Sequence, residues 1–144
     1  MAYRSEEVGP FTLWAKHKDQ GVSGVKAAQK VKPVQQKDEP DLWCCGACNH
    51  TITETRNAIS VSGNHSHRFM NRAGFLFEIG CFGQASGCAQ QGVPEEDYSW
   101  FPDYTWRFAL CAQCHTHLGW RFDADGTGFW GLIFERLVQR LGQN

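Results

Sequence analysis

Cys111-Ala112-Gln113-Cys114 and Cys45-Gly46-Ala47-Cys48 are the two stretches that decide the fold of this 144-residue chain. The C-x-x-C spacing lets one tight turn present two thiolates to a single ion, and two such turns complete a tetrahedral four-cysteine zinc site. Four thiolates leave no open coordination position. We therefore expect one structural Zn²⁺ per chain, held by Cys45, Cys48, Cys111 and Cys114, that ties the start of a domain to its end.

Other interpretations of the cysteines remain open at this point. A redox dithiol is the alternative for a single C-x-x-C motif, but two motifs without a βαβ pattern favour zinc. His50, His115 and His117 are possible substitute ligands. The three remaining cysteines are interpreted as ordinary buried or exposed thiols: Cys44, Cys81 and Cys88.

Around the motifs, apolar stretches of strand length alternate with turn residues, which predicts an all-β domain with long loops. The expected strands lie within 51–53, 74–79, 105–110, 120–122 and 129–134, and the expected turns at 62–64, 83–87, 92–94 and 123–126. A helical period occurs only at the C-terminus and predicts one or two helical turns there, carried by Phe134, Leu137, Val138 and Leu141.

All six lysines lie within the first 40 residues, and the rest of the chain is lysine-free and mildly acidic. This boundary predicts two parts: a flexible, lysine-containing arm over 1–40 and a folded domain over 41–144. A short helix over 22–31 that docks on the domain is the alternative for part of the arm. The formal net charge of −1 argues against a binder of nucleic-acid phosphates.

The sequence also indicates the cellular compartment of the protein. We find neither a membrane-length apolar run nor a secretory leader pattern, so we expect no membrane partner and a cytoplasmic location. In a reducing compartment, seven cysteines are more often metal ligands or free thiols than disulfides.

The most unusual stretch is 98–106, Tyr-Ser-Trp-Phe-Pro-Asp-Tyr-Thr-Trp, in which a Pro-Asp turn is flanked by Trp100 and Trp106. Trp120 and Phe122 share one face of an expected strand. These rings form either core or an aromatic pocket. A pocket would suit a flat neutral ring, or a methylated ammonium if Glu95, Glu96 and Asp97 pointed inward.

The ordered motifs resemble the cereblon-type thalidomide-binding (CULT) domain, and the similarity looks closest to the short stand-alone bacterial cereblon-like proteins. The resemblance covers about residues 42–140. It is carried by the cysteine pairs together with 69–75 (Phe-Met-Asn-Arg-Ala-Gly-Phe), 99–106, 111–122 and 129–132 (Phe-Trp-Gly-Leu).

The resemblance implies a β-tent, in which two roughly orthogonal antiparallel sheets are pinned by the four-cysteine zinc site. It also implies a tri-tryptophan cage for a cyclic imide such as glutarimide, with backbone groups near Tyr98 and Trp100 binding the imide. The site residues that it implies are Asn71, Phe77, Tyr98, Ser99, Trp100, Trp106, Trp120 and Phe122.

The chain departs from the family pattern at three positions. Asn-Pro of the family is Asn71-Arg72 here, the histidine before Ser-Trp is Tyr98, and the glycine of the Phe-Pro-Gly-Tyr turn is Asp103. The Tyr98 carbonyl remains available to an imide. Arg72 at the rim points to an anionic or extended ligand.

Three functions follow from these patterns. The first is a non-enzymatic module that binds a cyclic imide or uracil-like ring, free or at a modified protein C-terminus. The second is a methionine-sulfoxide-reductase-like enzyme on a related fold, which would need Cys81 or Cys88 as a reactive thiol. The third is an aromatic-cage reader of methylated ammonium groups. Cereblon itself receives ligase substrates through further domains, so ligase activity is not assigned to this chain.

Overall fold

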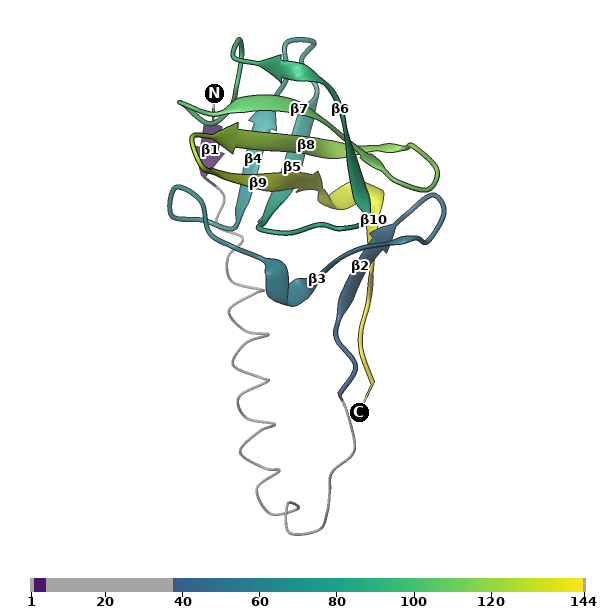
Figure 1. Cartoon of the computed structure of the whole chain (residues 1–144). Coiled ribbons are helices and arrows are strands. Elements are labelled where there is room, and N and C mark those ends of the chain that lie inside the picture. The colour runs from purple at the N-terminus through teal and green to yellow at the C-terminus, as the bar shows by residue number, and fades with distance from the viewer. Residues whose placement is uncertain (1, 5–37, 144) are drawn as a thin grey trace.

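The computed structural model describes residues 2–4 and 38–143, which form an almost entirely β domain (Figure 1). Apart from 2–4 and 38–40, the expected arm and its alternative helix over 22–31 lie outside the described residues, so the boundary at residue 40 stays a prediction. The strands are β1 (Ala2–Arg4), β2 (Leu42–Cys45), β3 (Thr51–Glu54), β4 (Ser66–Met70), β5 (Leu76–Phe82), β6 (Cys88–Glu95), β7 (Thr105–Cys111), β8 (His117–Ala124), β9 (Thr127–Ile133) and β10 (Leu137–Arg140).

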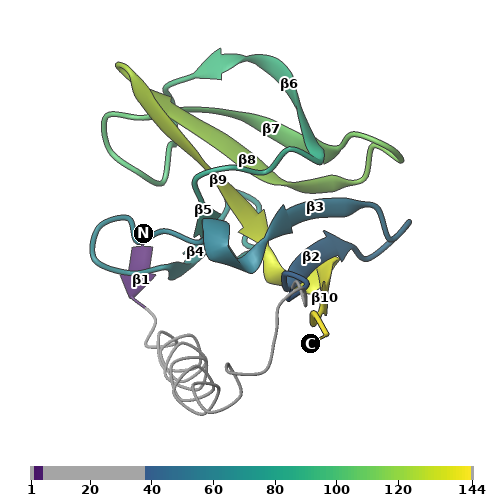
Figure 2. The same ribbon diagram turned by 60° about the horizontal axis from the view of Figure 1, so that its bottom comes forward.

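Two antiparallel sheets contain these strands, as expected. The larger sheet has the order β1-β4-β5-β9-β8-β7-β6, and the smaller one has the order β10-β2-β3. The strands β2 and β10 run across the direction of β7, β8 and β9 (Figure 1). Seen from below, β2, β3 and β10 gather on one side of the larger sheet (Figure 2). The first and last strands of the stretch 38–143, β2 and β10, thus pair with each other in the small sheet.

Each of the five expected strands falls within or overlaps an observed one, but two other expectations are wrong. The C-terminal helix is absent from the described residues: a 3₁₀ turn over Phe134–Arg136 leads into β10, where pairing with β2 buries Leu137 and leaves Val138 exposed. The expected turn at 92–94 is a bulge in β6, an edge strand that tolerates Pro94 because one side of its ladder has no partner.

Two clusters of buried side chains lie on opposite faces of the large sheet, because side chains alternate along its strands. In β8, the register shift beside Gly119 interrupts this alternation, so that Leu118 belongs to one cluster and Trp120 to the other. One cluster fills the space between the sheets and includes Ile52, Leu118 and Leu132 beside the cysteine motifs. The other is rich in rings and lies behind the aromatic residues of the expected pocket. Its buried members are Phe69, Ile79, Cys81, Phe101, Trp120, Phe122, Phe129 and Ile133.

Gly87 and Gly119 allow the close approaches that this arrangement needs. A Cβ at Gly87 would collide with the Thr51 carbonyl oxygen, and a Cβ at Gly119 would collide with the Gly131 carbonyl oxygen. Gly119 also has a φ of 159° at a register shift between β7 and β8. Its backbone lets β8 bend immediately before Trp120.

The described part of the chain contains no helix with the length and hydropathy needed for a membrane span.

Candidate functional site

The two C-x-x-C motifs fold into turns with the same local geometry. In the first, the Asn49 N–H donates to the Cys45 carbonyl oxygen at 2.8 Å, and in the second the His115 N–H donates to the Cys111 carbonyl oxygen at 2.9 Å. Asn49 and His115 both lie in the left-handed region, with φ of 70° and 66°. The motifs are therefore structural repeats, each built to present two sulfur atoms from one turn.

The structure brings the four predicted metal ligands together. The Sγ atoms of all four cysteines lie within 4.8 Å of one another. Cys45 Sγ is 3.7 Å from Cys114 Sγ, and Cys48 Sγ is 3.6 Å from Cys111 Sγ. A tetrahedron with metal–sulfur bonds of about 2.3 Å has edges of about 3.8 Å, so these thiols fit a Zn²⁺ ion.

Hydrogen bonds favour the thiolate form at some of the four sulfur atoms, whereas burial and the neighbouring thiols raise the pKa values of Cys45 and Cys48. The Gln113 N–H donates to Cys111 Sγ at 3.4 Å, and the Ala47 N–H donates to Cys45 Sγ at 3.4 Å. The side chain and backbone of Thr116 hydrogen-bond Cys114 and lower the pKa of its thiol to about 6. Donors aimed at sulfur stabilise negative charge there.

The cluster of candidate metal-ligating side chains includes none of the three histidines considered as substitute ligands. His117 instead faces the other side of its strand, where its Nε2 lies 2.8 Å from the Gly119 carbonyl oxygen. Burial, together with the nearby Arg136 charge, lowers the pKa of His117 below its usual value. A neutral imidazole there belongs to the neighbouring pocket.

That pocket has a volume of about 630 Å³ and opens on the face of the large sheet away from the small one. All eight predicted binding residues line it. Sequence reasoning missed four further lining residues. A strand period of two starting from Trp106 would have found Phe108, whereas no pattern in the sequence marked the other three as pocket residues. The four are Met70, Ala73, Phe108 and His117.

Three tryptophans form the aromatic walls. Trp100 and Trp120 meet at 4.8 Å between ring centroids with an interplanar angle of 72°, so they make a corner rather than a stack. Trp106 is fixed by its indole N–H, which donates to the Asp97 carbonyl oxygen at 2.8 Å. Phe122 is 1% exposed and lies beneath them in the ring cluster. The part of the pocket that the three tryptophans border is the tryptophan slot.

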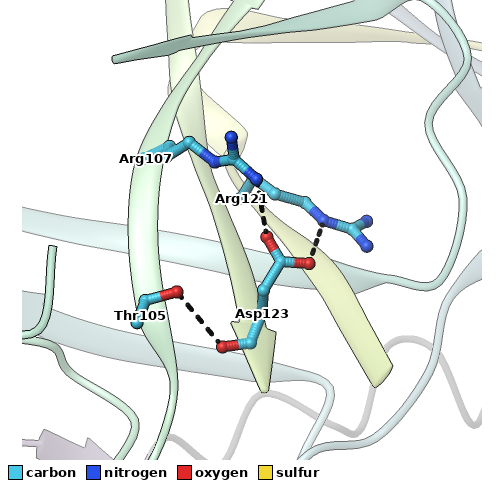
Figure 3. Close-up of polar contacts among 4 residues, drawn as sticks. All are labelled: Thr105, Arg107, Arg121 and Asp123. Carbon is cyan, nitrogen blue, oxygen red and sulfur yellow. Dashed lines mark hydrogen bonds and ion pairs between the residues drawn. The ribbon is translucent and has the colours of Figure 1, made fainter. Parts of the chain in front are cut away.

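On the opposite face of β7 and β8, ion pairs hold the strands that carry these walls. The Asp123 carboxylate accepts from Arg107 Nη2 at 3.4 Å and from Arg121 Nε at 3.1 Å, and the Asp123 carbonyl oxygen accepts from Thr105 Oγ1 at 3.3 Å (Figure 3). These contacts tie the strand of Trp106 to the strand of Phe122.

The segment 98–104 places Trp100 in the pocket through two local turns. Ser99 Oγ donates to the Phe101 carbonyl oxygen at 3.0 Å and accepts the Phe101 N–H at 3.3 Å. The Tyr104 N–H then donates to the Phe101 carbonyl oxygen at 3.1 Å, with Asp103 at a φ of 73°. This is a type II β-turn, whose third position favours glycine. Aspartate tolerates the left-handed region well enough to serve there.

The facing loop between β4 and β5 is organised by Asn71. Its Oδ1 accepts the N–H groups of Ala73 at 3.0 Å and of Phe75 at 2.9 Å, so the amide oxygen shapes the loop. This loop directs Arg72 across the mouth of the pocket, where its guanidinium carbon lies 4.1 Å from the centre of the Tyr98 ring. Arg72 and Tyr98 thereby connect the two loops that border the pocket.

The positions of Cys81 and Cys88 argue against their interpretation as reactive thiols. Cys81 and Cys88 do not line the pocket. Burial raises the pKa of each thiol to about 12. The three acidic residues that would favour an ammonium ligand, Glu95, Glu96 and Asp97, do not line it either.

No protein-family model matches the chain. The chain is similar to protein cereblon of Gallus gallus, at 33% identity over 106 residues that make up 68% of this chain and 24% of that protein. It is also similar to protein cereblon of Danio rerio, at 32% identity over 108 residues, which are 69% of this chain and 25% of that protein. The chain thus spans about a quarter of the length of these two relatives.

Among solved structures, the crystal structure of the Mis18 'Yippee-like' domain superposes with a TM-score of 0.50 at 12% identity, covering 74% of this chain and all of that domain. This likeness concerns the fold alone. The sequence similarities support a cereblon-like domain in this chain. The narrower expectation of closest similarity to short bacterial proteins stays a prediction.

Proposed function

We propose that this chain is a zinc-stabilised binding module whose tri-tryptophan pocket takes a cyclic imide of the glutarimide type or a uracil-like ring, free or at a modified protein C-terminus. The similarity to cereblon and the geometry of the four thiols support the general form of the proposal. The ligand class rests on the walls of the pocket and on the polar groups left open beside them.

The observation that carries the proposal concerns backbone groups beside the pocket that lack a hydrogen-bond partner among the described residues. Within the described residues, the backbone N–H and C=O groups of Tyr98 and Trp100 make no hydrogen bond. Tyr98 has a φ of 63°, a conformation that a non-glycine residue adopts at some cost. A ring that offers an N–H between two carbonyls can pair with such groups while its faces contact indole rings.

The charge of the pocket lining favours a neutral imide over a methylated ammonium. A flat imide is neutral, and it exchanges hydrogen bonds with water for hydrogen bonds with backbone, so the net gain comes from burying its faces. A methylated ammonium would meet Arg72, which is the charged member of the described lining. Like charge at the mouth opposes cation binding.

An enzymatic role finds little support in the same residues. A sulfoxide reductase needs a thiolate that reaches its substrate, and the two candidate thiols are placed outside the pocket lining with raised pKa values. Zinc coordinated by four thiolates keeps no position open for a reacting group. We therefore retain the non-enzymatic module.

Calorimetric titration of the zinc-loaded chain tests the proposal. We expect glutarimide and uracil to bind with one site per chain, and N-methylglutarimide, which lacks the imide N–H, to bind at least tenfold more weakly. Tetramethylammonium serves as the cation probe and should not compete. Absence of heat and of tryptophan quenching at millimolar glutarimide, with a folded chain, would refute the proposal.

A further inference from the structure

The charge at the mouth of the pocket narrows the ligand class. Arg72 is the one lining residue, within the part of the chain that the structure describes, with a full charge at neutral pH, since burial keeps His117 neutral. No carboxylate of the described residues lies within ion-pair distance of its guanidinium. An arginine remains charged at any physiological pH, so an uncompensated positive charge stands beside an otherwise neutral slot.

Two features of the loop orient this charge. The Asn71 side chain organises the loop through two backbone hydrogen bonds, and the guanidinium lies over the Tyr98 ring. Within the described residues the guanidinium makes this ring contact and no ion pair. Its N–H groups can therefore donate to a ligand, and their fork matches the two oxygens of a carboxylate.

We propose that Arg72 determines specificity by selecting rings that carry a carboxylate close to the imide. This inference rests on the proposed function and deepens it: the imide ring enters the tryptophan slot, and its anionic substituent stays at the mouth and pairs with Arg72. The carboxylate belongs either to a small acid or to an acidic residue that precedes a cyclic imide at a peptide C-terminus.

Matched ligand pairs measure this selection. For the small acid, the pair is 3-(succinylamino)glutarimide and its methyl ester. For the peptide, the pair ends in the same cyclic imide after Glu or after Gln. The zinc-loaded chain should bind the charged member about three- to fivefold more tightly in at least one pair, which is the upper part of the range for an exposed ion pair. The advantage should shrink between 50 and 300 mM salt.

Two variants separate a local effect from a change in total charge. In Arg72→Gln we expect the preference for the charged ligand, measured as the ratio of the two affinities within each pair, to fall below twofold. Arg68→Gln is the matched control, because Arg68 is an exposed residue of β4 that does not line the pocket. It removes the same charge and should leave the preference intact. Zinc content and circular dichroism confirm that both variants fold.

The outcomes distinguish this inference from the proposed function. Equal affinity for the charged and neutral members of both pairs overturns the role of Arg72 and leaves the imide pocket standing. A preference that persists in Arg72→Gln, or that disappears in Arg68→Gln, also overturns it. If neither glutarimide nor the neutral ligands bind at all, the proposed function itself fails, and the inference fails with it.

Discussion

Arg136 donates from one nitrogen, Nη1, to two acceptors of His117: the backbone oxygen at 2.9 Å and the imidazole Nδ1 at 3.2 Å. Because arginine cannot accept a hydrogen bond, we infer that the proton of this imidazole is on Nε2, which then donates to the Gly119 carbonyl oxygen. The Arg136 carbonyl oxygen in turn accepts the Gly46 N–H at 2.9 Å. One residue therefore joins the first cysteine turn to the lining of the pocket.

Replacement of Arg136 should change the titration of His117. The pKa of His117 lies below its usual value because burial disfavours the charged imidazole and the Arg136 charge adds to this effect. In Arg136→Gln we expect this pKa to rise toward about 6.5, the value of an unperturbed histidine. Imidazole resonances followed by NMR between pH 5 and 8 measure it. An unchanged pKa would show that the contact has no electrostatic effect on His117.

The sign of this shift also fixes how His117 affects stability. A histidine with a lowered pKa binds a proton more readily in the unfolded chain, so its contribution to stability is present above pH 6.5 and declines as the pH falls toward its folded pKa. Arg136→Gln should reduce that decline.

Zinc removal should unfold the domain. The binding free energy of a structural zinc site is about 10–16 kcal/mol, which is comparable to the whole stability of a typical domain. We expect one zinc per chain by elemental analysis, loss of β-sheet circular dichroism with a strong chelator, and recovery on adding zinc.

Cys48→Ser should reproduce this loss without chelator. Cys88→Ala is the matched control, because Cys88 faces Cys111 across β6 and β7 but is not a member of the four-thiol cluster. It should retain zinc. A chain that keeps its fold and melting temperature after complete zinc removal would contradict the structural role of the metal.

The tryptophans of the pocket should differ from those of the core in their effect on binding. Trp106→Ala removes a wall and should weaken glutarimide binding at least tenfold, since aromatic contacts are worth about 0.5–1.5 kcal/mol beyond the area that they bury. Trp130 lies in the cluster between the sheets and is 8% exposed. Trp130→Phe should cost stability but leave the affinity within twofold. Calorimetry avoids the change in fluorescence that either substitution brings.

Asp103 tests the turn that positions Trp100. Its φ of 73° disfavours most side chains by about 1 kcal/mol, and aspartate tolerates this region better than alanine. Asp103→Ala should lower the free energy of unfolding by about 1 kcal/mol, whereas Asp103→Gly should leave it within about 0.5 kcal/mol. Asp125→Ala is the control at an exposed aspartate outside the left-handed region. Urea titrations of the zinc-loaded variants measure these differences, and equal effects of the two alanine variants would argue against strain at Asp103.

The metal ligands could be predicted from the sequence because a C-x-x-C spacing defines its own turn. The pattern of aromatic residues left the rings as either core or pocket, and only the resemblance to cereblon-type domains pointed to Trp106, Trp120 and Phe122 as pocket residues. The strand β4 was not foreseen, because Ser66 and His67 are polar and yet buried. The hydrogen bond from His67 to the Val61 carbonyl oxygen makes that burial possible, and such pairings across a loop leave no trace in hydropathy.

The prediction of a C-terminal helix was wrong because of a tertiary contact. Leu137, Val138 and Leu141 do fall at helical spacing, but only Leu137 is buried, while Leu141 is 62% exposed. Pairing with β2 along the whole of β10 stabilises an extended chain that local periodicity could not indicate. The contact between Arg72 and Tyr98 at the rim of the pocket could not be predicted from the sequence either, because it joins two loops that only the fold brings together.

Imide binding between the tryptophans can be followed by a glutarimide titration of the ¹⁵N-labelled, zinc-loaded chain, observed through its indole N–H resonances. We expect saturable shifts of Trp100, Trp106 and Trp120 with a single dissociation constant, and no shift of Trp43 or Trp130, which pack with the core between the sheets. Absence of shifts at millimolar glutarimide, or shifts confined to Trp43 and Trp130, would contradict this expectation.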